Sequence, residues 1–319
     1  MAQTTASGRQ AWGYGLSTVA SDGTILDTWF PSPQLGAVPA SRDPHIAPAA
    51  LEALIGTDVR RDVRVDFVTV QIDLDTSPAS TPDAYLRLHL LSHLLVTPNS
   101  IDLDGIFAHL PIVAWTSAGP MHPGTFAARR PVLQRHGISI SGLDKFPRLL
   151  DYVVPERVRI ADASRVRLGA YLSPGTTVMH EGFVNYNAGT LGSSMVEGRI
   201  SQGVVVGDGS DIGGGASIMG TLSGGGTTRV SIGRRALLGA NSGVGISIGD
   251  DSVVEAGLYV TAGTKVAILG DDAPMPVVVK ASDLSGVPGL LFRRNSATGA
   301  VEVLSRSGAG VTLTTALHA

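Results

Sequence analysis

The sequence contains no cysteine among its 319 residues. This absence excludes disulfide bonds, thiolate metal sites and a cysteine nucleophile, although it does not identify the compartment. No apolar run approaches the ~18 residues that a membrane-spanning helix needs. The first 15 residues also lack the basic and then apolar pattern of a signal peptide. We therefore expect a cytoplasmic protein that has no membrane partner.

Charge is also scarce. Charged residues make up 16% of the chain and the net charge is −3, which gives no reason to expect nucleic acid as a partner. Glycine is abundant instead: the chain has 40 glycines among 319 residues, well above the usual share of roughly 7%. Hydrophobic residues make up 43%. This combination predicts many tight turns around short buried strands rather than disorder.

Residues 1–110 are expected to form a small α/β domain. A β-hairpin is predicted across residues 12–30, because two strand-like runs flank Asp22-Gly23, a dipeptide suited to a type I′ turn. Residues 63–74 are rich in β-branched side chains and predict a long strand.

A helix should follow that strand. Thr81 is expected to cap it, Pro82 suits its first turn, and Pro98 should end it. Residues 111–154 are interpreted as a connecting segment that contains a helix around residues 124–136.

The informative part of the chain is a repeat between residues 155 and 268. Apolar or small residues recur every six positions, slip once by four, and then resume the same period. A period of six fits neither the 3.6 of a helix nor the two-residue alternation of a strand. It fits a triangular coil with three faces and 18 residues per turn, which is a left-handed parallel β-helix. The repeating positions are Ile160, Val166, Leu172, Val178, Val184, Thr190 and Val196, then Val206, Ile212, Ile218, Gly224, Val230, Ala236, Ser242, Ile248, Val254, Val260 and Val266.

Residues 269–319 no longer follow the repeat. We expect them to form a short β cap, with strands at 290–293 and 300–304, that covers the open end of the coil. The fold class is thus mainly β, with an α/β N-terminal domain. By analogy with other rods of this kind, we expect a homotrimer whose active sites lie in the clefts between neighbouring rods.

Counting hexads across the slip predicts which residues are neighbours on adjacent coils, about 4.8 Å apart. It places Glu197 next to Met219, and Gly198 next to Gly220. A carboxylate beside a glycine-rich backbone favours a general base near an oxyanion-binding amide. The alternative is a solvated glutamate on the face of the rod, paired with Arg199 or with a neighbouring subunit.

Two other functions are compatible with the coil. His180 is the only histidine in the repeat, and it would be the base if the chain were a sugar or nucleotide-sugar acyltransferase. The third hypothesis is a trimeric scaffold without enzymatic activity. A zinc site of the carbonic-anhydrase type needs three histidines, so one histidine excludes it.

Several runs of sequence carry a resemblance to a known family. They are residues 144–148, 179–190, 194–201, 213–226 and 292–296, which include Met-His-Glu-Gly-Phe-Val-Asn-Tyr and Phe-Arg-Arg-Asn-Ser. The chain resembles the 2,3,4,5-tetrahydropyridine-2,6-dicarboxylate (tetrahydrodipicolinate) N-succinyltransferases, in the branch with an extended N-terminal domain. The resemblance implies a step of diaminopimelate and lysine biosynthesis. Succinyl-CoA would donate its succinyl group to the amine of L-2-amino-6-oxopimelate, the ring-opened substrate.

The resemblance also assigns roles to residues. Glu197 matches the catalytic glutamate, which acts either through an acyl-anhydride intermediate or as the base in a direct attack. The amide of Gly220 matches the donor that stabilises the thioester oxyanion. The matching succinyl-CoA contacts are Arg199, Gly214, Ser217, Ala240, Glu255, Ala256, Gly263, Lys280, Arg293, Arg294, Asn295 and Ser296.

Relatives can hold a divalent cation, such as Mg²⁺, on the trimer axis. The resemblance assigns one ligand to Glu181, and the matching position for an aspartate ligand falls on Ser164. Serine is a poor magnesium ligand. We therefore expect any metal on this axis to depend on Glu181 and to be non-catalytic.

Overall fold

The computed structural model describes residues 9–224, 227–269 and 276–306. The part of the predicted cap beyond residue 306 and the stretch 270–275 lie outside the described residues. The chain divides into two compact units, one ending at Val154 and the other beginning at Pro155. No helix in the described part is long and apolar enough to cross a membrane.

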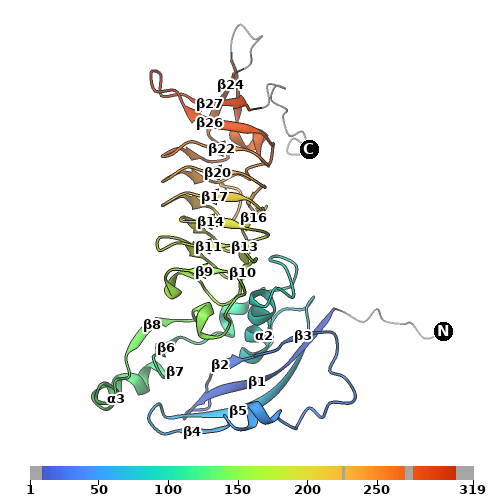
Figure 1. Cartoon of the computed structure of the whole chain (residues 1–319), viewed down its shortest axis with the longest axis vertical. Helices are drawn as coiled ribbons and strands as arrows, with labels where there is room; N and C mark the ends of the chain where they lie inside the picture. Colours follow the sequence, from blue (N-terminus) through green and yellow to red (C-terminus); the bar gives the residue numbers. More distant parts are fainter. Residues whose placement is uncertain (1–8, 225–226, 270–275, 307–319) are drawn as a thin grey trace, which may run out of the picture. The chain divides into compact units, whose positions relative to one another are not determined.

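The N-terminal unit is built on an antiparallel sheet in the order β2-β1-β5-β4, with β3 paired to β1 (Figure 1). Val63–Asp73 forms the predicted long strand, β5. It pairs with β1 along its whole length, from Ala20 opposite Val63 to Gln10 opposite Asp73. The other strands are β1 (Gln10–Ala20), β2 (Ile25–Trp29), β3 (Gln34–Leu35) and β4 (Gly56–Asp58), and a short helix α1 covers Ala49–Glu52.

The predicted hairpin is confirmed, but its turn differs from the prediction. A type I′ turn needs positive φ at both central residues, and only Gly23 has it, at +89°. The register also shifts where Thr18 faces Asp27 and Val19 faces Ile25, which leaves one extra residue on β2. The hairpin closes through residues 21–23, where the N–H of Gly23 donates to the carbonyl of Ala20 at 2.9 Å, and the bulge follows within β2.

Helix α2 (Thr81–Ser92) follows, as predicted, but both of its ends differ from the prediction. Ser80 is the cap, because its hydroxyl accepts the backbone N–H of Asp83 at 3.3 Å. The helix ends at Ser92, and Leu94 has a left-handed φ of +60°, so the chain leaves the helix before Pro98. Arg87 is fully buried in this helix and donates to the Asp83 carboxylate at 2.7 Å.

A second small sheet, in the order β7-β6-β8, belongs to the predicted connecting segment. Its strands are β6 (Val113–Thr116), β7 (Gly119–Met121) and β8 (Ile140–Asp144). The predicted helix is present as α3 (Pro123–Arg135). Leu133 of α3 packs with Ala114, Met121 and Ile138 in a core that fixes the helix on the sheet.

His89 is buried in α2 as a neutral ring. Its Nε2 accepts the backbone N–H of Phe30 at 3.3 Å, and its Nδ1 lies 2.8 Å from the carbonyl oxygen of Tyr85. Burial lowers the pKa of His89 to about 3, against the opposing effect of the hydrogen bond to Tyr85. The unfolded chain binds this proton near pH 6.5, so stability is lost as the pH falls from 6.5 towards 3.

This shift predicts a measurable acid sensitivity. Between pH 7 and pH 4, the wild type should lose about 3 kcal/mol more unfolding free energy than His89→Gln, because only the wild type must keep this ring neutral. Burial raises the pKa of Asp27, which acts in the opposite direction, but Asp27 is present in both proteins and cancels. Urea unfolding at several pH values measures the difference. Equal pH profiles for the two proteins would show that His89 is not buried in its neutral form.

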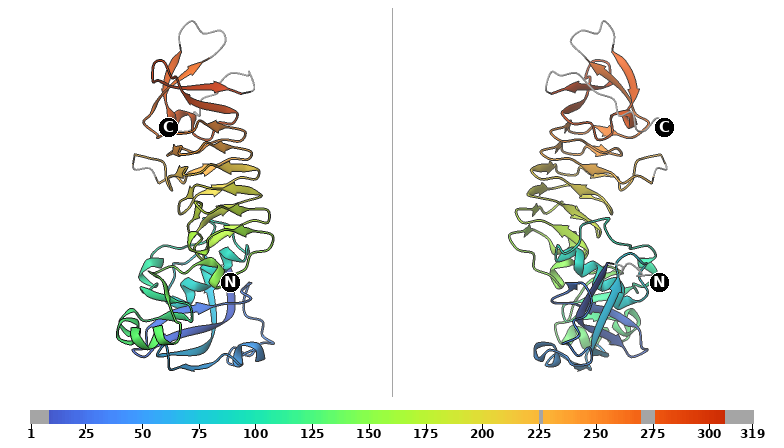
Figure 2. Two further views of the ribbon diagram at one scale, coloured as in Figure 1. Left: turned by 60° about the vertical axis from the view of Figure 1, so that its left-hand side comes forward. Right: turned by 90° about the vertical axis from the view of Figure 1, so that its right-hand side faces the viewer.

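The C-terminal unit is a left-handed parallel β-helix with three faces (Figures 1 and 2). We number the faces in the order in which the chain crosses them. We call the corner between faces 1 and 2 edge A, and the corner between faces 2 and 3 edge B. Face 1 contains β9 (Arg159–Ile160), β11 (Thr177–Val178), β14 (Ser194–Val196), β17 (Ser210–Ile212), β20 (Leu237–Leu238) and β22 (Val253–Val254). Face 2 contains β12 (Phe183–Val184), β15 (Arg199–Ile200), β18 (Ser217–Ile218), β21 (Gly243–Val244) and β23 (Tyr259–Val260). Face 3 contains β10 (Ala170–Leu172), β13 (Ala188–Thr190), β16 (Val205–Val206) and β19 (Ser231–Ile232).

The coils do not keep the uniform stacking that hexad counting predicts. Val178 pairs with Val196, but Val196 pairs with Ile212 and not with Ile218. The slip is a shortened corner, in which the inward-facing Ile200 follows the inward-facing Val196 after four positions instead of six. Residues 202–205 are therefore not the origin of the slip, and Ile218 stacks on Ile200 instead.

Two further irregularities cancel each other in the sequence. Among the described residues, the next inward residue after Ile218 that stacks on the coil below is Ile232, 14 positions on. After Val244 it is Ile248, four positions on. The first spacing is eight residues too long and the second is two too short, which together equal one whole hexad. The predicted positions Val230, Ala236 and Ser242 are buried, but they precede the stacked residues by two positions.

The two predicted C-terminal strands are confirmed as β26 (Leu290–Arg294) and β27 (Val301–Ser305). With β24 (Lys265–Leu269) and β25 (Val277–Lys280) they form a sheet in the order β25-β24-β27-β26. Strand β26 continues face 1, since Val254 pairs with Phe292. In this way the cap pairs the strand edge that the last coil would leave open.

Candidate active site

Glu197 lies on edge A, directly after β14. Its backbone N–H donates to Ile212 at 2.8 Å, and its carbonyl accepts the N–H of Gly215 at 3.3 Å. A Cβ atom on Gly214 would lie 3.5 Å from Glu197 Oε2. Among the described residues, the carboxylate has no hydrogen-bond or ion-pair partner. A partly buried carboxylate beside bare glycine backbone is thus free to accept a proton or to attack an acyl carbon.

The small residues of the following coils continue edge A above Glu197. Ala240 follows β20, and its carbonyl accepts the N–H of Gly257 at 2.8 Å. A Cβ atom on Gly239 would lie 2.5 Å from the backbone nitrogen of Ala256. The backbone of the next coil therefore occupies the place that a side chain on Gly239 would take. We call this stretch of edge A, with Gly213, Gly214, Gly239 and Ala240, the glycine track. Because its residues have little or no side chain, a ligand lying along it could approach the backbone closely.

The cap supplies polar groups at the upper end of the track. Glu255 Oε2 accepts the backbone N–H of Arg294 at 2.6 Å, which joins edge A to β26. Arg293 forms an ion pair with Glu302 at 3.1 Å. The Asn295 amide donates to Glu302 at 2.7 Å, and its oxygen accepts two backbone N–H groups of the exposed turn that contains Ser296.

Arg199 lies on face 2, two residues after Glu197. It pairs in register with Ser217, and its guanidinium donates to the Ser217 hydroxyl. Arg199 is exposed and has no carboxylate partner in the described part of the chain. A guanidinium in this state can bind a ligand carboxylate through two hydrogen bonds.

Gly220 lies elsewhere, on edge B. It follows β18, its carbonyl accepts the N–H of Val230 at 3.2 Å, and a Cβ atom on it would lie 2.8 Å from the carbonyl of Gln202. The predicted contacts of Glu197 with Met219 and of Gly198 with Gly220 are therefore wrong. Gly198 lies beneath Gly213 and Ala216 instead, because the coil is shortened between Val196 and Ile200. That four-residue spacing was the signal that could have identified Gly213 and Gly214 as the neighbours.

Gly263 and Lys280 also lie at the edge B side. The space beside Gly263 is open, because a Cβ atom placed on it would meet none of the described heavy atoms within 4 Å. Ala281, which follows Lys280, donates its N–H to Thr264 at 2.8 Å. The structure thus divides the predicted site residues between two edges of one rod.

Glu181 and His180 lie on edge A one coil below Glu197, and both are exposed. Glu181 lies 3.5 Å from the Arg165 guanidinium and 3.1 Å from His180 Nδ1. The Ser164 hydroxyl donates to Asp162. The described residues contain no group of three potential metal ligands. A metal on the trimer axis would need the Glu181 carboxylates of three copies of the chain, and no chemical step is assigned to it.

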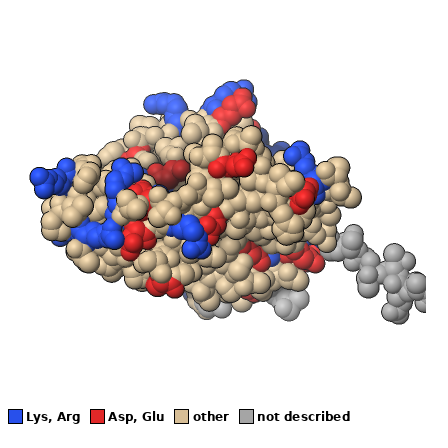
Figure 3. Space-filling model, turned by 90° about the horizontal axis from the view of Figure 1, so that it is seen from below, with Lys and Arg blue, Asp and Glu red and all other residues tan. Residues whose placement is uncertain are grey.

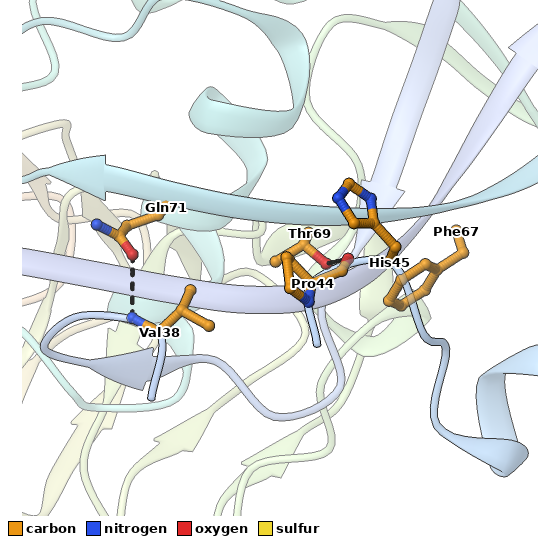
Figure 4. Close-up of a pocket in the computed structure, with 6 residues that line it drawn as sticks. All are labelled: Val38, Pro44, His45, Phe67, Thr69 and Gln71. Carbon is orange, nitrogen blue, oxygen red and sulfur yellow. Dashed lines mark hydrogen bonds between the residues drawn. The ribbon is translucent and has the colours of Figure 1, made fainter. Parts of the chain in front are cut away.

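The N-terminal unit has surface hollows of its own. One of about 510 Å³ is lined by Val38, Pro44, His45, Phe67, Thr69 and Gln71 (Figure 4). The N–H of Val38 donates to Gln71 at 3.0 Å and the Thr69 hydroxyl donates to Pro44, so these polar groups bond to each other. On the face shown in Figure 3, basic and acidic side chains are interspersed rather than gathered into patches of one sign.

Comparison with known proteins decides the family. A relative from Pseudomonas aeruginosa named 2,3,4,5-tetrahydropyridine-2,6-dicarboxylate N-succinyltransferase is 57% identical over 77% of this chain and 72% of its own length. A relative of the same name from Vibrio cholerae is 48% identical over 97% of this chain and 98% of its own length. The chain belongs to this N-succinyltransferase family. It is therefore an acyltransferase of the hexapeptide-repeat class, as the resemblance implied.

Two further comparisons agree with this membership. Residues 110–148 match the family model "Tetrahydrodipicolinate N-succinyltransferase middle", and residues 229–262 match "Hexapeptide repeat of succinyl-transferase". A crystal structure from Campylobacter jejuni, described as a 2,3,4,5-tetrahydropyridine-2-carboxylate N-succinyltransferase, superimposes with a TM-score of 0.79. It is 32% identical and covers 94% of this chain and 93% of its own. The fold of this chain is thus similar to that of the Campylobacter jejuni protein over most of both chains.

Proposed function

We propose that this chain transfers a succinyl group from succinyl-CoA to the amine of L-2-amino-6-oxopimelate, with Glu197 as the catalytic carboxylate. The products are N-succinyl-2-amino-6-oxopimelate and CoA, in the diaminopimelate and lysine pathway. Family membership supports the donor and acceptor classes. The observation that carries the assignment to a residue is the carboxylate of Glu197 beside Gly214, unpaired among the described residues.

The reaction needs a base and a place for the developing charge. The acceptor amine attacks the thioester carbonyl, the C–S bond breaks, and the amine gives up a proton while CoA leaves as a thiolate that takes one up. Glu197 receives the proton in a direct attack, or it attacks the thioester first and forms an acyl anhydride that the amine then opens. Arg199 is placed to hold the succinyl carboxylate in either route.

Gly220 can take part only if a second copy of the chain supplies it. An oxyanion donor must lie about 3 Å from the reacting oxygen, whereas Gly220 and Glu197 occupy different edges of one rod. We infer that edge A of one copy faces edge B of the next in a homotrimer. The donor would then lie between Arg199, Gly214, Ser217, Ala240, Glu255, Ala256 and Arg293 to Ser296 on one side, and Gly263 and Lys280 on the other.

Release of CoA thiol from succinyl-CoA, measured with different acceptors, tests this function. We expect release to depend on the ring-opened dicarboxylate amine and to be absent with amino sugars and nucleotide sugars. Release with a sugar acceptor alone would favour the alternative in which His180 is the base. No release with any acceptor would favour a trimeric scaffold. The exposed position of His180, beside Glu181 and away from the glycine track, argues against the sugar alternative.

A further inference from the structure

Lysine is rare in this chain. It has three lysines, Lys145, Lys265 and Lys280, and the other 21 of its 24 basic residues are arginines (24 − 3 = 21). Two of the three lysines are direct cross-strand partners, because Lys265 on β24 faces Lys280 on β25 in the antiparallel register. Such partners point to the same side of a sheet with their Cβ atoms about 5 Å apart. Two exposed lysine side chains therefore lie side by side on the cap sheet.

This pairing is unfavourable unless an anion joins it. Like charges directly opposite each other destabilise a sheet, and neither lysine forms an ion pair within residues 9–224, 227–269 and 276–306. Nearby carboxylates already have partners. Asp283 accepts the backbone N–H of Lys280 at 3.1 Å, and Glu302 is bound by Arg293 and by an asparagine.

The lysine pair shares its face of the cap with a predicted donor contact. Arg293 is opposite Glu302 on β27, and Glu302 is opposite Ala267 on β24. Ala267 is two residues from Lys265, and residues two apart on a strand point to the same side. Arg293 thus points to the same side of the cap sheet as the lysine pair, but it lies two strands away on β26, whereas the lysines lie at the edge B side with Gly263.

We propose that Lys265 and Lys280 together bind the 3′-phosphate of the CoA donor, so that Lys265 determines specificity for the phosphorylated donor. This inference rests on the proposed succinyl transfer. The 3′-phosphate is a monoester and carries close to two negative charges at neutral pH, whereas each phosphate of the diphosphate linkage carries one. Two compact ammonium charges match the dianion.

Steady-state kinetics with succinyl-CoA and succinyl-dephospho-CoA test the proposal. The wild type should have the lower KM for succinyl-CoA. In Lys265→Met the KM for succinyl-CoA should rise about tenfold, the size expected for one hydrogen bond between charged groups. The KM for succinyl-dephospho-CoA and both kcat values should not change. Lys265→Arg should keep most of the preference, which separates lost charge from damaged folding.

The matched control is Arg60→Met, which removes an exposed cation from the N-terminal unit and should leave both KM values unchanged. A wild type that does not distinguish the two donors overturns the proposal. So does an equal rise of both KM values in Lys265→Met. Calorimetric binding of CoA and dephospho-CoA provides a readout without turnover. Suppose that the wild type binds CoA more tightly than dephospho-CoA, that Lys265→Met removes this preference, and that no succinyl transfer is detected. These results together would uphold the phosphate site and contradict the proposed function.

Discussion

Replacing Glu197 with glutamine is expected to lower kcat by about 10³-fold, within the range that a positioned acid or base contributes. Glutamine has nearly the same shape but cannot accept a proton or form an anhydride. The KM for succinyl-CoA should change little, because Arg199 and the glycine track do not depend on this carboxylate. Acceptor-dependent thiol release measures both quantities, and the melting temperature should stay close to that of the wild type, since the carboxylate has no partner among the described residues.

The matched control for this variant is His180→Ala, which removes the rival base from the coil below. It should keep wild-type kcat, because His180 is exposed and its ring contacts Glu181 rather than the glycine track. The opposite pair of results, an inactive His180→Ala and an active Glu197→Gln, would transfer the catalytic role to the histidine. It would also make the sugar acyltransferase the better function.

The largest expected effect on stability is that of Gly189→Ala. Gly189 lies in β13 opposite Tyr171 of β10, and a Cβ atom on it would lie 1.8 Å from the carbonyl oxygen of Tyr171. The obstacle is backbone, so no rotamer change relieves it, and two coils must move apart. We expect a loss of about 3 kcal/mol or more, which places it among the severe single substitutions. Denaturant unfolding of the purified protein measures the loss.

Gly263→Ala is the matched control for stability in the same unit. Its added methyl group would meet no described heavy atom within 4 Å, and its φ lies outside the left-handed region. The change should be within about 0.5 kcal/mol, as for most exposed substitutions. Equal unfolding free energies for the two variants would mean that the close approach of Gly189 to Tyr171 is wrong.

The coil could be predicted from the sequence because the positions that face inward accept few residue types. The narrow core requires apolar side chains at positions such as Val178, Val196 and Ile212. Apolar residues therefore recur with a period of six in the sequence. The same reasoning placed the β-hairpin, the long strand β5 and the two cap strands, where alternation and turn residues act locally. Helix α3 was predicted by the same local signals.

The stacking of coils could not be predicted in the same way. A corner can be shortened or lengthened without changing the type of residue that faces inward. The extra residues after Ile218 and the missing residues after Val244 add up to one hexad, so the six-residue period after them is unchanged. The hydrogen-bond register shows directly that Glu197 neighbours Gly213 and Gly214, and the short spacing between Val196 and Ile200 is its one signal in the sequence. The opposition of Lys265 and Lys280 was equally hidden, because it depends on where β24 and β25 pair.

Succinyl transfer that depends on Glu197 can be tested in one experiment. The wild type and Glu197→Gln are incubated with succinyl-CoA and the ring-opened acceptor, and free CoA thiol and N-succinylated product are quantified in the same samples. We expect equal amounts of thiol and product with the wild type, and neither above background with Glu197→Gln. Equal formation of both products by the variant would contradict the role of Glu197. Thiol release by the wild type without any N-succinylated product would contradict the reaction itself.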